Sequence, residues 1–533
     1  MALRTIPDLL AHGAAEFAEQ PAIVDQGQVL TYAGLREAAV AAARGYRALG
    51  VEPGDRVAIW APNRAEFIVA LLGAQLIGAS VVPLNTRYRG LEAHVILERS
   101  RAVVLVLCDG FLTTDYSTML VEAGRDRDGS GPVVGGLPHL RTLVDIASAG
   151  RPATLGWDAF LAAGESVAQR EVDELAAAVE PTTVCDILFT SGTTGVPKGV
   201  MSTHAQTISV ADVWARGARM STADRYAIVN PFFHGFGYKA GVIACLTAGT
   251  TIHPVPTFDP VALMRLVQEA RITVLPGAPT IFTTLINHPR RGEFDLSSLR
   301  FAIAGAASVP ESLFEQMLDV LGFETVAQAY GLTECVVATQ SRPDEDPRHV
   351  AETTGPPVPG IEARVVDAEG EDLPVGQEGE IWLRGDNVML GYFEDPEATD
   401  AAIDPEGWFH TGDVGRFDEH GCLKITDRIK DMFIVGGFNV YPAEVERLLS
   451  SHPAVMECAV VGVADDRLGA AGRAYVVVRP GAELDPEELR GWARERLANF
   501  KVPRDVVLVR DLPRNASGKV LKTDLREEQP AGS

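Results

Sequence analysis

The chain has 533 residues, of which 46% are apolar and 22% are charged. These values are ordinary for a folded globular protein and exclude a wholly disordered chain, and the length predicts roughly two to four domains. Acidic residues number 72 against 47 lysines and arginines, so the formal net charge is −25. That charge disfavours nucleic acid and anionic membrane surfaces as partners.

The six cysteines are scattered, with no C-x-x-C pair and no neighbouring cluster of histidines. This spacing disfavours a disulfide framework or a zinc site and is typical of a protein in a reducing compartment. The N-terminal segment MALRTIPDLLAHGAAEF lacks the basic stretch followed by an apolar core that marks a signal peptide. We therefore expect a cytoplasmic protein.

The first buried strand is predicted at residues 56–63, RVAIWAPN. The most apolar stretch follows at residues 67–84 and is long enough to suggest a membrane span. Gln75 and Gly78 interrupt this stretch, and Pro83 ends it. It therefore predicts a buried helix followed by a buried strand.

Further along the chain, strand-like runs alternate with helical ones. Residues 273–279, 300–307 and 325–331 predict buried strands that end in small or glycine-rich loops, and residues 310–322 predict a helix. This alternation is typical of α/β layers with parallel strands. Ligands of such sheets usually lie beyond the carboxyl ends of the strands.

The chain changes character near residue 427. PAEVERLLSSH and DPEELRGWARERL predict helices, whereas ECAVVGV and RAYVVVR predict strands. Together they predict a compact α+β unit of about a hundred residues, a typical size for a small domain. We expect two domains, at residues 1–428 and 429–533.

The strongest local signal is ILFTSGTTGVPKG at residues 187–199. A strand-like start runs into a turn whose hydroxyl and backbone N–H groups are suited to a phosphate, with a lysine to add positive charge. The spacing is not that of a Walker A loop, and a surface turn without function is the alternative. The candidate residues are Thr190, Ser191, Gly192, Thr193, Thr194, Gly195 and Lys198.

The string TSGTTGVPKG resembles the phosphate loop of the adenylate-forming superfamily: acyl-CoA synthetases, adenylation domains of peptide synthetases and luciferases. The resemblance spans nearly the whole chain and implies a large N-terminal domain of layered α/β subdomains with a small mobile α+β C-terminal domain. It also implies ATP, Mg²⁺ and coenzyme A as cofactor and co-substrates. Further strings that match in the expected order are AYGLTE (329–334), GEIWLRG (379–385), FHTGD (409–413), DRIKDMFIVGGFNVYPAEVE (427–446) and PRNASGKVLKTDLRE (513–527).

The chemistry of this superfamily explains why a lysine is needed. A carboxylate is a poor acyl donor, but its attack on the α-phosphate of ATP makes an acyl-adenylate whose leaving group is AMP. Two anions must meet in that step, so a cation between them stabilises the transition state. By resemblance that cation is Lys519 in PRNASGK, where the bare sequence suggests only a surface lysine.

The same resemblance implies the rest of the nucleotide site. Glu334 is implied as the Mg²⁺ ligand, and oxygen ligands are what this cation prefers. Tyr330 resembles the ring that stacks on adenine, Asp413 the carboxylate that accepts both ribose hydroxyls, and Arg428 the second ribose contact. Thr190 is implied in catalysis together with Glu334 and Lys519. The remaining nucleotide-binding residues that the resemblance implies are Gly305, Ala306, Ala307, Gly331 and Thr333.

Lys430 occupies the position where this superfamily places the hinge of its small domain. Rotation there is implied to move Lys519 out and the GGFN segment in between the two half-reactions. Gly436 and Gly437 would then line the channel of the pantetheine arm, where a side chain would block the thiol. A simple β-turn is the alternative for this Gly-Gly pair, and both interpretations can hold together.

The acid is expected to lie near NPFFHGFGYKAG, at residues 230–241. Amino-acid-activating relatives carry an aspartate after this region, and here glycine and phenylalanine follow His234, which disfavours an amino acid. The glycines Gly235, Gly237 and Gly241 are expected to leave room for a bulky apolar group. The acyl-pocket candidates are His234, Gly235, Phe236, Tyr238, Lys239 and Val336.

The stretch from NPFFHGFGYKAG to the GGFNVYPAEVE segment most resembles an actinobacterial branch that activates the bicyclic propanoate left after steroid ring opening, which implies a role in cholesterol catabolism. Lys239 is then expected to pair with a polar ring substituent. The predicted activity is an ATP-dependent acid–CoA ligase that releases AMP and pyrophosphate. The alternatives are a medium- or long-chain fatty acid–CoA ligase, an enzyme that loads a carrier protein, and a catalytically dead nucleotide-binding scaffold. The expected partners are a small carboxylic acid, ATP and CoA; a homodimer is left open.

Overall fold

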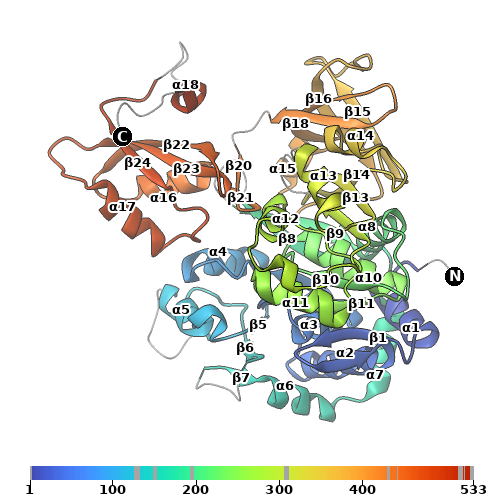
Figure 1. Cartoon of the computed structure of the whole chain (residues 1–533). Coiled ribbons are helices and arrows are strands. Elements are labelled where there is room, and N and C mark those ends of the chain that lie inside the picture. The colour runs from blue at the N-terminus through green and yellow to red at the C-terminus, as the bar shows by residue number, and fades with distance from the viewer. Residues whose placement is uncertain are drawn as a thin grey trace. The chain divides into compact units, whose positions relative to one another are not determined.

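The computed structural model describes residues 3–124, 133–147, 153–191, 197–304, 311–428, 432–440, 442–513, 520 and 522–527. The chain divides into two compact units (Figure 1). The first comprises Met1–Thr86, Ala93–Phe189 and Gly199–Asp427, and the second comprises Arg87–Glu92, Thr190–Lys198 and Arg428–Ser533. The division at Asp427 lies one residue before the predicted boundary. The sequence did not predict that two short segments from the N-terminal part would join the second unit.

The largest sheet has eight strands, and its central ones are buried along their length. The pairs among its third to eighth strands are parallel, whereas the first is antiparallel to the second. Near-continuous burial is typical of a parallel sheet that is covered on both faces, and it confirms the strand expected in RVAIWAPN. In sheet order the strands are β17 (Gly391–Tyr392), β9 (Pro197–Thr203), β8 (Val184–Ser191), β4 (Ser80–Pro83), β3 (Arg56–Trp60), β5 (Val104–Leu107), β6 (Thr142–Asp145) and β7 (Leu155–Gly156).

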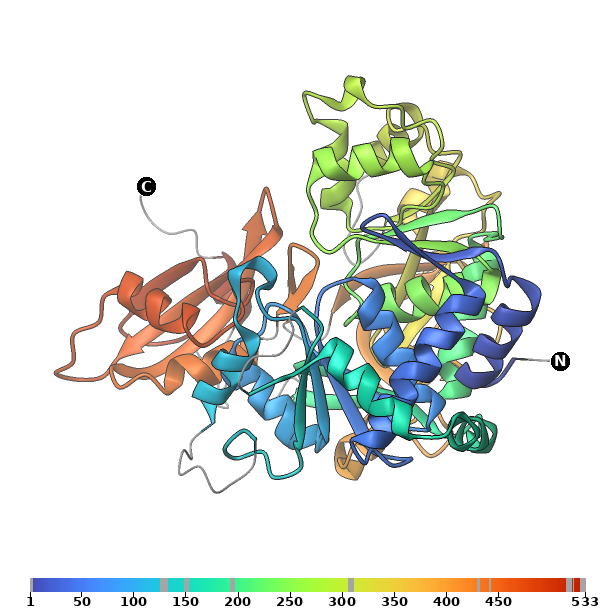
Figure 2. The ribbon, with the colours of Figure 1, turned by 90° about the horizontal axis from the view of Figure 1, so that it is seen from below.

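The most apolar stretch of the sequence folds as a helix and a strand, as expected. Helix α3 (Ala65–Leu76) buries every residue from Phe67 onward, and β4 follows it in the sheet. Helix α2 (Tyr32–Ala48) packs along α3 (Figure 2). Within the described ranges, no helix combines the length and the apolar character that a membrane crossing requires.

Two smaller sheets meet through one extended segment. Val274 forms parallel bridges to Tyr226 on one side and Phe301 on the other. The strands of the first sheet are, in order, β10 (Arg225–Ile228), β11 (Thr251–Pro254), β1 (Pro21–Asp25) and β2 (Gln28–Thr31). Those of the second are β12 (Phe301–Ala304), β13 (Thr325–Leu332) and β14 (Cys335–Gln340).

The expectation of a regular strand at residues 273–279 is therefore wrong. The segment is extended and inside the sheet, but it makes only isolated bridges. Pro276 has no N–H to donate to a neighbouring strand, and Pro279 already begins a helix. The strands expected at 300–307 and 325–331 are β12 and β13, and the carboxyl end of β12 leads into residues 305–307, which lie outside the described chain.

A fourth sheet in the first unit is antiparallel where its pairing is given, between β15 and β16 and between β16 and β18. Its strands are, in order, β15 (Ile361–Val366), β16 (Gly379–Gly385), β18 (Phe409–Phe417) and β19 (Leu423–Arg428). The other helices up to residue 428 are α1 (Ile6–Glu16), α4 (Gly90–Ser100), α5 (Tyr116–Ala123), α6 (Trp157–Ala163), α7 (Gln169–Ala178), α8 (His204–Gly217), α9 (Gly235–Gly237), α10 (Ala244–Ala248), α11 (Pro260–Ala270), α12 (Pro279–Ile286), α13 (Glu311–Asp319), α14 (Pro347–Glu352) and α15 (Pro396–Ala402).

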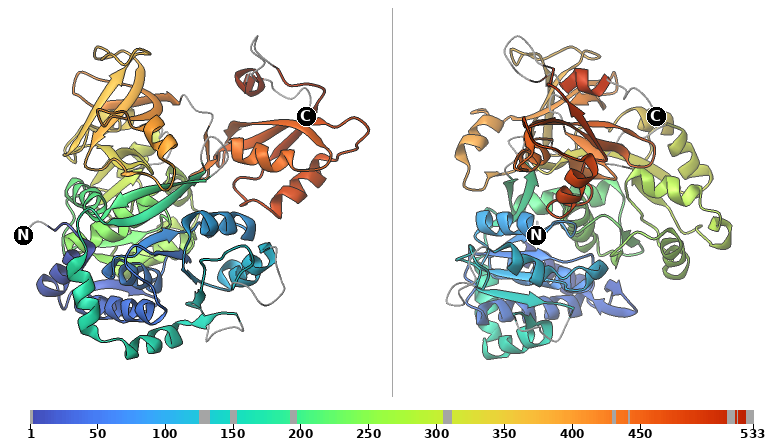
Figure 3. Two further views of the ribbon diagram at one scale, coloured as in Figure 1. Left: turned by 180° about the vertical axis from the view of Figure 1, so that it is seen from behind. Right: turned by 90° about the vertical axis from the view of Figure 1, so that its left-hand side faces the viewer.

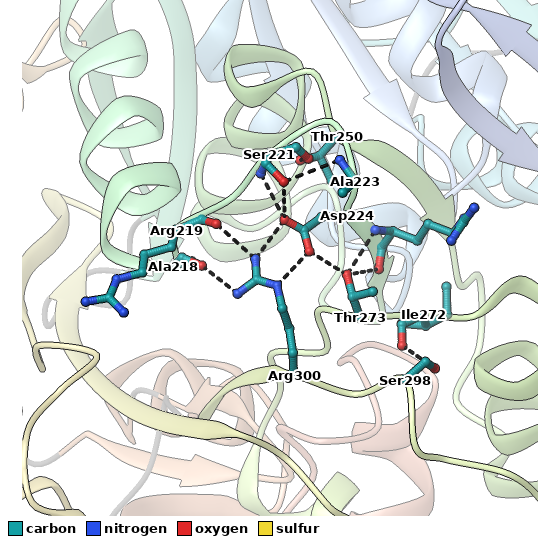
Figure 4. A network of polar contacts seen from close by, with 11 residues as sticks. Ala218, Arg219, Ser221, Ala223, Asp224, Thr250, Ile272, Thr273, Ser298 and Arg300 are labelled. Carbon is teal, nitrogen blue, oxygen red and sulfur yellow. Dashed lines mark hydrogen bonds and ion pairs between the residues drawn. The ribbon is translucent and has the colours of Figure 1, made fainter.

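A polar network fixes the start of β12 (Figure 4). Asp224 is only 3% exposed, and its carboxylate accepts two hydrogen bonds from the Arg300 guanidinium, each 2.7 Å long. The same carboxylate accepts a bond from Thr273 Oγ1 at 2.7 Å. Burial alone would raise the pKa of Asp224, but these hydrogen bonds outweigh it and hold the pKa below its ordinary value. The network therefore ties the loop before β10 to the strand that leads to residues 305–307.

Replacing Asp224 with asparagine is expected to lower the free energy of unfolding by about 3 kcal/mol at pH 7, because the variant leaves Arg300 without its charge partner. The folded-state pKa is depressed, so this stabilisation is present above pH of about 4 and is lost as pH falls through the folded pKa. Urea unfolding of the two proteins from pH 7 to pH 3 checks this. If the difference in free energy of unfolding between the parent and the variant stays constant down to pH 3, this stabilisation by Asp224 is contradicted.

The matched control is Asp212→Asn, which removes an exposed ion pair with Arg216 one helical turn away. Its effect is expected to stay within about 0.5 kcal/mol, because such pairs on a helix surface contribute little.

The second unit is built on a sheet whose two faces are both covered. Helices α16 and α17 pack on one face with Val460 and Val476 in a shared cluster, whereas α18 packs on the other with Val461 and Tyr475 (Figure 1 and Figure 3). Side chains that alternate along the strands explain the two faces. The helices and strands expected after residue 427 are confirmed. They are β20 (Phe433–Val435), β21 (Phe438–Val440), α16 (Pro442–Ser450), β22 (Val455–Asp465), β23 (Gly469–Val478), α17 (Pro486–Arg494), β24 (Asp505–Val509) and α18 (Lys522–Glu527).

Candidate active site

The YGLTE motif forms the tip of the β13–β14 hairpin. Leu332 pairs with Cys335, so Thr333 and Glu334 make the turn, and the register shifts by a bulge between Tyr330 and Leu332. A Cβ atom at Gly331 would overlap the backbone carbonyl of Val336 across the hairpin. The glycine is therefore required by a close backbone approach, and the bulge re-aims the side chains on either side of it.

Two residues that the sequence assigned to adenine and ribose lie together. The Tyr330 hydroxyl donates to Asp413 Oδ2 at 2.6 Å, and both residues are 8% exposed. Burial raises the pKa of Tyr330, and the adjacent Asp413 carboxylate raises it further, so the phenol keeps its proton. Thr411 helps to hold Asp413 in β18, because its hydroxyl accepts from the Asp413 N–H and donates to Ile381 O. An aromatic ring and a carboxylate thus form one face that is suited to a nucleoside.

The Glu334 carboxylate has a partner that the sequence did not reveal. The Tyr392 hydroxyl donates to Glu334 Oε1 at 2.9 Å, and Tyr392 lies in β17, paired with Val200 of β9. Glu334 is half-buried at the hairpin tip. No motif or spacing marked Tyr392 in the sequence. The segment before it is held at the hairpin, because the Met389 N–H donates to Glu334 O at 2.7 Å and Val388 forms a bridge with Cys335.

Part of the expected acyl pocket lies next to the β13–β14 hairpin. A Cβ atom at Gly235 would lie 2.9 Å from Val336 Cγ2, so a larger residue there would need Val336 to move. The half-buried Phe236 ring packs edge-on against Trp214, with ring centroids 5.2 Å apart. His234 is exposed and precedes the short helix α9, which contains Gly235 and Phe236. Its Nδ1 accepts a hydrogen bond from the Phe236 N–H at 3.2 Å. Trp214, in α8, was not predicted from the sequence.

The other two glycines of this region do not make room for a ligand. A Cβ atom at Gly237 would overlap the backbone carbonyls of Asn230 and Pro231, and one at Gly241 would lie 3.3 Å from the Ile228 side chain. Both glycines allow close packing within the protein. The expectation that they widen the pocket is therefore wrong.

The expectation that Lys239 meets the substrate is also corrected. Residues Tyr238–Ile243 form a π-helical turn, and Lys239 on it is only 1% exposed. Its Nζ lies 3.0 Å from Asp186 Oδ1 and donates to Ser202 Oγ at 2.6 Å. The ammonium group is thus paired with protein atoms in the core, and its alanine variant would leave Asp186 buried without its cation.

Tyr238 belongs to the core as well. It is fully buried, and its hydroxyl accepts from Gln75 Nε2 at 2.6 Å. Burial raises the pKa of Tyr238 well above its ordinary value. The hydroxyl is thus held by a protein side chain, so Tyr238 is corrected from a pocket residue to a packing residue.

Several predicted residues lie outside the described part of the chain: Gly192, Thr193, Thr194, Gly195, Gly305, Ala306, Ala307, Lys430 and Lys519. Ser191 and Arg428 are described only as strand residues, at the ends of β8 and β19. Thr190 and Lys198 are half-buried and belong to the second unit. Their roles at the phosphates stay predictions.

The Gly-Gly pair forms the turn between β20 and β21. Gly436 and Gly437 have φ angles of +56° and +88°, and Val435 pairs with Phe438 across them. Two consecutive residues with positive φ are typical of the tight hairpin turn that glycine favours. The turn interpretation is therefore confirmed, and the channel interpretation stays a prediction.

Comparison with known proteins shows the family to which the chain belongs. A family model described as AMP-binding enzyme matches residues 10–393, and one described as AMP-binding enzyme C-terminal domain matches residues 444–519. The 3-[(3aS,4S,7aS)-7a-methyl-1,5-dioxo-octahydro-1H-inden-4-yl]propanoyl:CoA ligase of Rhodococcus jostii (strain RHA1) is 48% identical, over 98% of this chain and 99% of its own. The ligase of the same name from Mycobacterium tuberculosis (strain ATCC 25618 / H37Rv) is 49% identical over the same shares.

Among solved structures, the amide bond synthetase McbA from Marinactinospora thermotolerans matches with a TM-score of 0.82 and 30% identity, over 98% of this chain and 99% of its own. The expected architecture of a large α/β part and a small α+β part is thereby confirmed. The matches cover nearly the whole chain and both of its expected domains. The chain therefore belongs to the AMP-binding enzyme family, and within that family to the acyl-CoA synthetases.

Proposed function

We propose that the protein joins coenzyme A to a bicyclic, keto-bearing propanoate derived from a steroid nucleus, with ATP as the energy source. The observation that carries adenylate formation is the 2.6 Å contact between Tyr330 and Asp413, which unites a ring for adenine with a carboxylate for ribose. The substrate class rests on the two ligases of that name that match along the whole chain.

The reaction proceeds in two balanced steps. A carboxylate oxygen of the acid bonds to the α-phosphorus of ATP while the bond to the pyrophosphate oxygen breaks. The thiol sulfur of CoA then bonds to the acyl carbon, the bond to the AMP oxygen breaks, and the thiol proton is released. Lys519 is proposed to stabilise the charge of the first step, and Asp413 and Tyr330 hold the nucleoside through both.

Glu334 is the residue proposed to hold Mg²⁺. Its carboxylate offers the hard oxygen ligand that this cation prefers, and the hydrogen bond from Tyr392 orients it from one side. The ion would neutralise phosphate charge and so ease the approach of the carboxylate. Thr190, Lys198 and the glycines between them are proposed to bind the phosphates through hydroxyl and backbone N–H groups.

The acid is proposed to enter beside Gly235, Phe236 and Val336. These side chains are apolar, and Trp214 backs Phe236 with a second large ring. No carboxylate follows His234 in the next four positions to balance an α-ammonium group, which would be costly to bury unpaired. A hydrophobic ring system suits this surface better than an amino acid.

We also place the protein in the cytoplasm, where ATP and CoA are available. All six cysteines are unpaired and buried, as expected of a chain that is kept reduced.

The test is a CoA-dependent AMP-release assay with the steroid-derived bicyclic propanoate, straight-chain fatty acids and aryl acids at equal concentrations. The bicyclic acid is expected to give a kcat/KM at least tenfold above that of every other acid. A fatty acid that equals it would overturn the substrate class while leaving the ligase activity intact. Acyl-AMP that accumulates without thioester for every acid would overturn CoA as the acceptor.

The channel proposal for Gly437 has its own test. Gly437→Trp is expected to form acyl-AMP at the normal rate but to cut thioester formation at least tenfold. Any side chain at φ of +88° strains the turn, so Gly437→Ala is the matched control for strain. Quenched-flow measurement of each half-reaction separates the two effects. Equal thioester rates in the two variants would contradict a channel role.

A further inference from the structure

A cluster of metal-ligand side chains lies in the first unit, among residues that the proposed reaction does not use. His349 Nδ1 is 2.9 Å from Glu345 Oε1, and the Cys422 thiol donates to the same oxygen at 3.2 Å. One ligand atom of each of these three residues lies within 4.8 Å of the other two. The other ring nitrogen, His349 Nε2, lies 2.6 Å from Asp418 Oδ2.

Two local structures hold these side chains in place. Glu345 lies just before Asp346, the N-cap of α14, and His349 lies in the first turn of that helix, four residues after Glu345. Asp418 Oδ1 accepts the backbone N–H groups of His420 and Cys422, which closes the tight turn between β18 and β19. The cluster therefore joins α14 to that turn.

We propose that Glu345, His349 and Cys422 bind one divalent zinc-class cation, with Asp418 as the residue that orients the histidine. A carboxylate oxygen, an imidazole nitrogen and a thiolate are the donors that zinc takes in proteins. A metal-bound histidine commonly donates its other N–H to a carboxylate, which is the arrangement of His349 Nε2 and Asp418. The thiolate distinguishes this site from one for Mg²⁺.

The cation would lie between the three donor atoms, and its binding would release the thiol proton. In a tetrahedral zinc site the donor atoms lie about 3.3–3.5 Å apart. The Nδ1–Oε1 separation of 2.9 Å and the Sγ–Oε1 separation of 3.2 Å need to widen by only a few tenths of an ångström, and the imidazole nitrogen and the thiol sulfur lie within 4.8 Å of each other. Three protein ligands leave the fourth position for water.

Burial and charge favour a cation here. Cys422 is fully buried, and the Glu345 side chain is 9% exposed, whereas His349 and Asp418 are 24% and 28% exposed and leave a route from solvent. The Glu345 and Asp418 carboxylates supply negative charge, and the Arg342 guanidinium, 3.9 Å from Glu345 Oε1, balances part of it. The sequence disfavoured a zinc site because its cysteines form no C-x-x-C pair and lie near no cluster of histidines. Cys422 lies 77 residues from Glu345, so no short ligand spacing marks this cluster.

The experiment uses the full-length protein after removal of metal with a chelator. Titration with Zn²⁺ against a chromophoric competitor is expected to show one tight equivalent. Co²⁺ in its place is expected to give a sulfur-to-metal charge-transfer band in the near ultraviolet, which reports thiolate ligation. No tight equivalent, or a Co²⁺ complex without that band, would overturn the proposal.

Variants locate the site. Cys422→Ser is expected to abolish the charge-transfer band, and Asp418→Asn to weaken zinc binding by about 10–100-fold. The asparagine keeps one oxygen for the two backbone N–H groups of the turn.

Two control variants are expected to bind zinc as the parent does. Cys458→Ser removes another buried thiol, and His420→Ala removes a ring that packs on His349. Loss of the tight equivalent in Cys458→Ser with normal binding in Cys422→Ser would overturn the assignment. The activation of the carboxylic acid substrate is measured in a separate assay. Failure of the zinc-site proposal can therefore be distinguished from failure of the proposed ligase activity.

Discussion

Replacing Lys519 with alanine is expected to slow carboxylate-dependent ATP–pyrophosphate exchange by about 10²–10³-fold, because one cation that neutralises two meeting anions is worth about 3–4 kcal/mol in the transition state. Transfer of a supplied acyl-adenylate to CoA is expected to stay within about twofold of the parent rate, since no second anion approaches phosphorus in that step. Separate rate measurements of ATP–pyrophosphate exchange and of acyl transfer from the adenylate to CoA check these two expectations.

The matched control is Lys424→Ala, which removes a partly exposed lysine whose ammonium lies 3.9 Å from Glu352. Both half-reactions of this variant are expected to match the parent. If Lys519→Ala slows the two half-reactions equally, the proposed division between adenylation and thioester formation is refuted.

Replacing Asp413 with alanine is expected to weaken AMP binding by about 10²-fold. Two charge-assisted hydrogen bonds to ribose are lost, each worth about 1.5 kcal/mol net at the low end of the range for charged groups. Tyr330→Phe keeps the ring and removes only the 2.6 Å hydrogen bond to Asp413. That variant is expected to lose about 3–10-fold in affinity. Equilibrium binding of AMP to the folded variants measures both.

Asp400→Ala serves as the control for charge, because Asp400 is exposed on α15, outside the proposed site. Its AMP affinity is expected to match that of the parent. If the Asp413 variant loses no more affinity than the Tyr330 variant, Asp413 does not contact the ribose, and its role is limited to holding the tyrosine.

The elements that the sequence predicted well are those set by local pattern. The buried strand β3 and the helix–strand pair after it follow from apolar runs that polar residues and Pro83 interrupt. Their motifs singled out Tyr330, Gly331 and Asp413, and the hairpin and β18 bring the tyrosine and the aspartate into contact, whereas their roles at the nucleotide stay predictions. A motif names residues, whereas only the fold supplies their contacts.

The errors arise where a distant partner decides the role of a residue. Lys239 looked available for a substrate because its partners, Asp186 and Ser202, lie on two strands far from it in sequence. Tyr392 was missed for the same reason, since nothing near Glu334 in the chain points to it. Buried ion pairs and side-chain hydrogen bonds between distant elements leave no periodicity, so the sequence alone does not reveal them.

The two-faced sheet of the second unit has a consequence for how the chain can be shortened. Leu512 and Leu525 lie in one apolar cluster, and the Tyr475 hydroxyl donates to Leu525 O at 2.8 Å. Leu512 and Leu525, which precede and follow Lys519 in the sequence, are thus both anchored on this face of the sheet. Truncation before α18 would keep every residue of the motif up to the lysine yet remove one of these two anchors. The final helix thus anchors the chain on the C-terminal side of Lys519, the residue proposed to stabilise the charge of the first step.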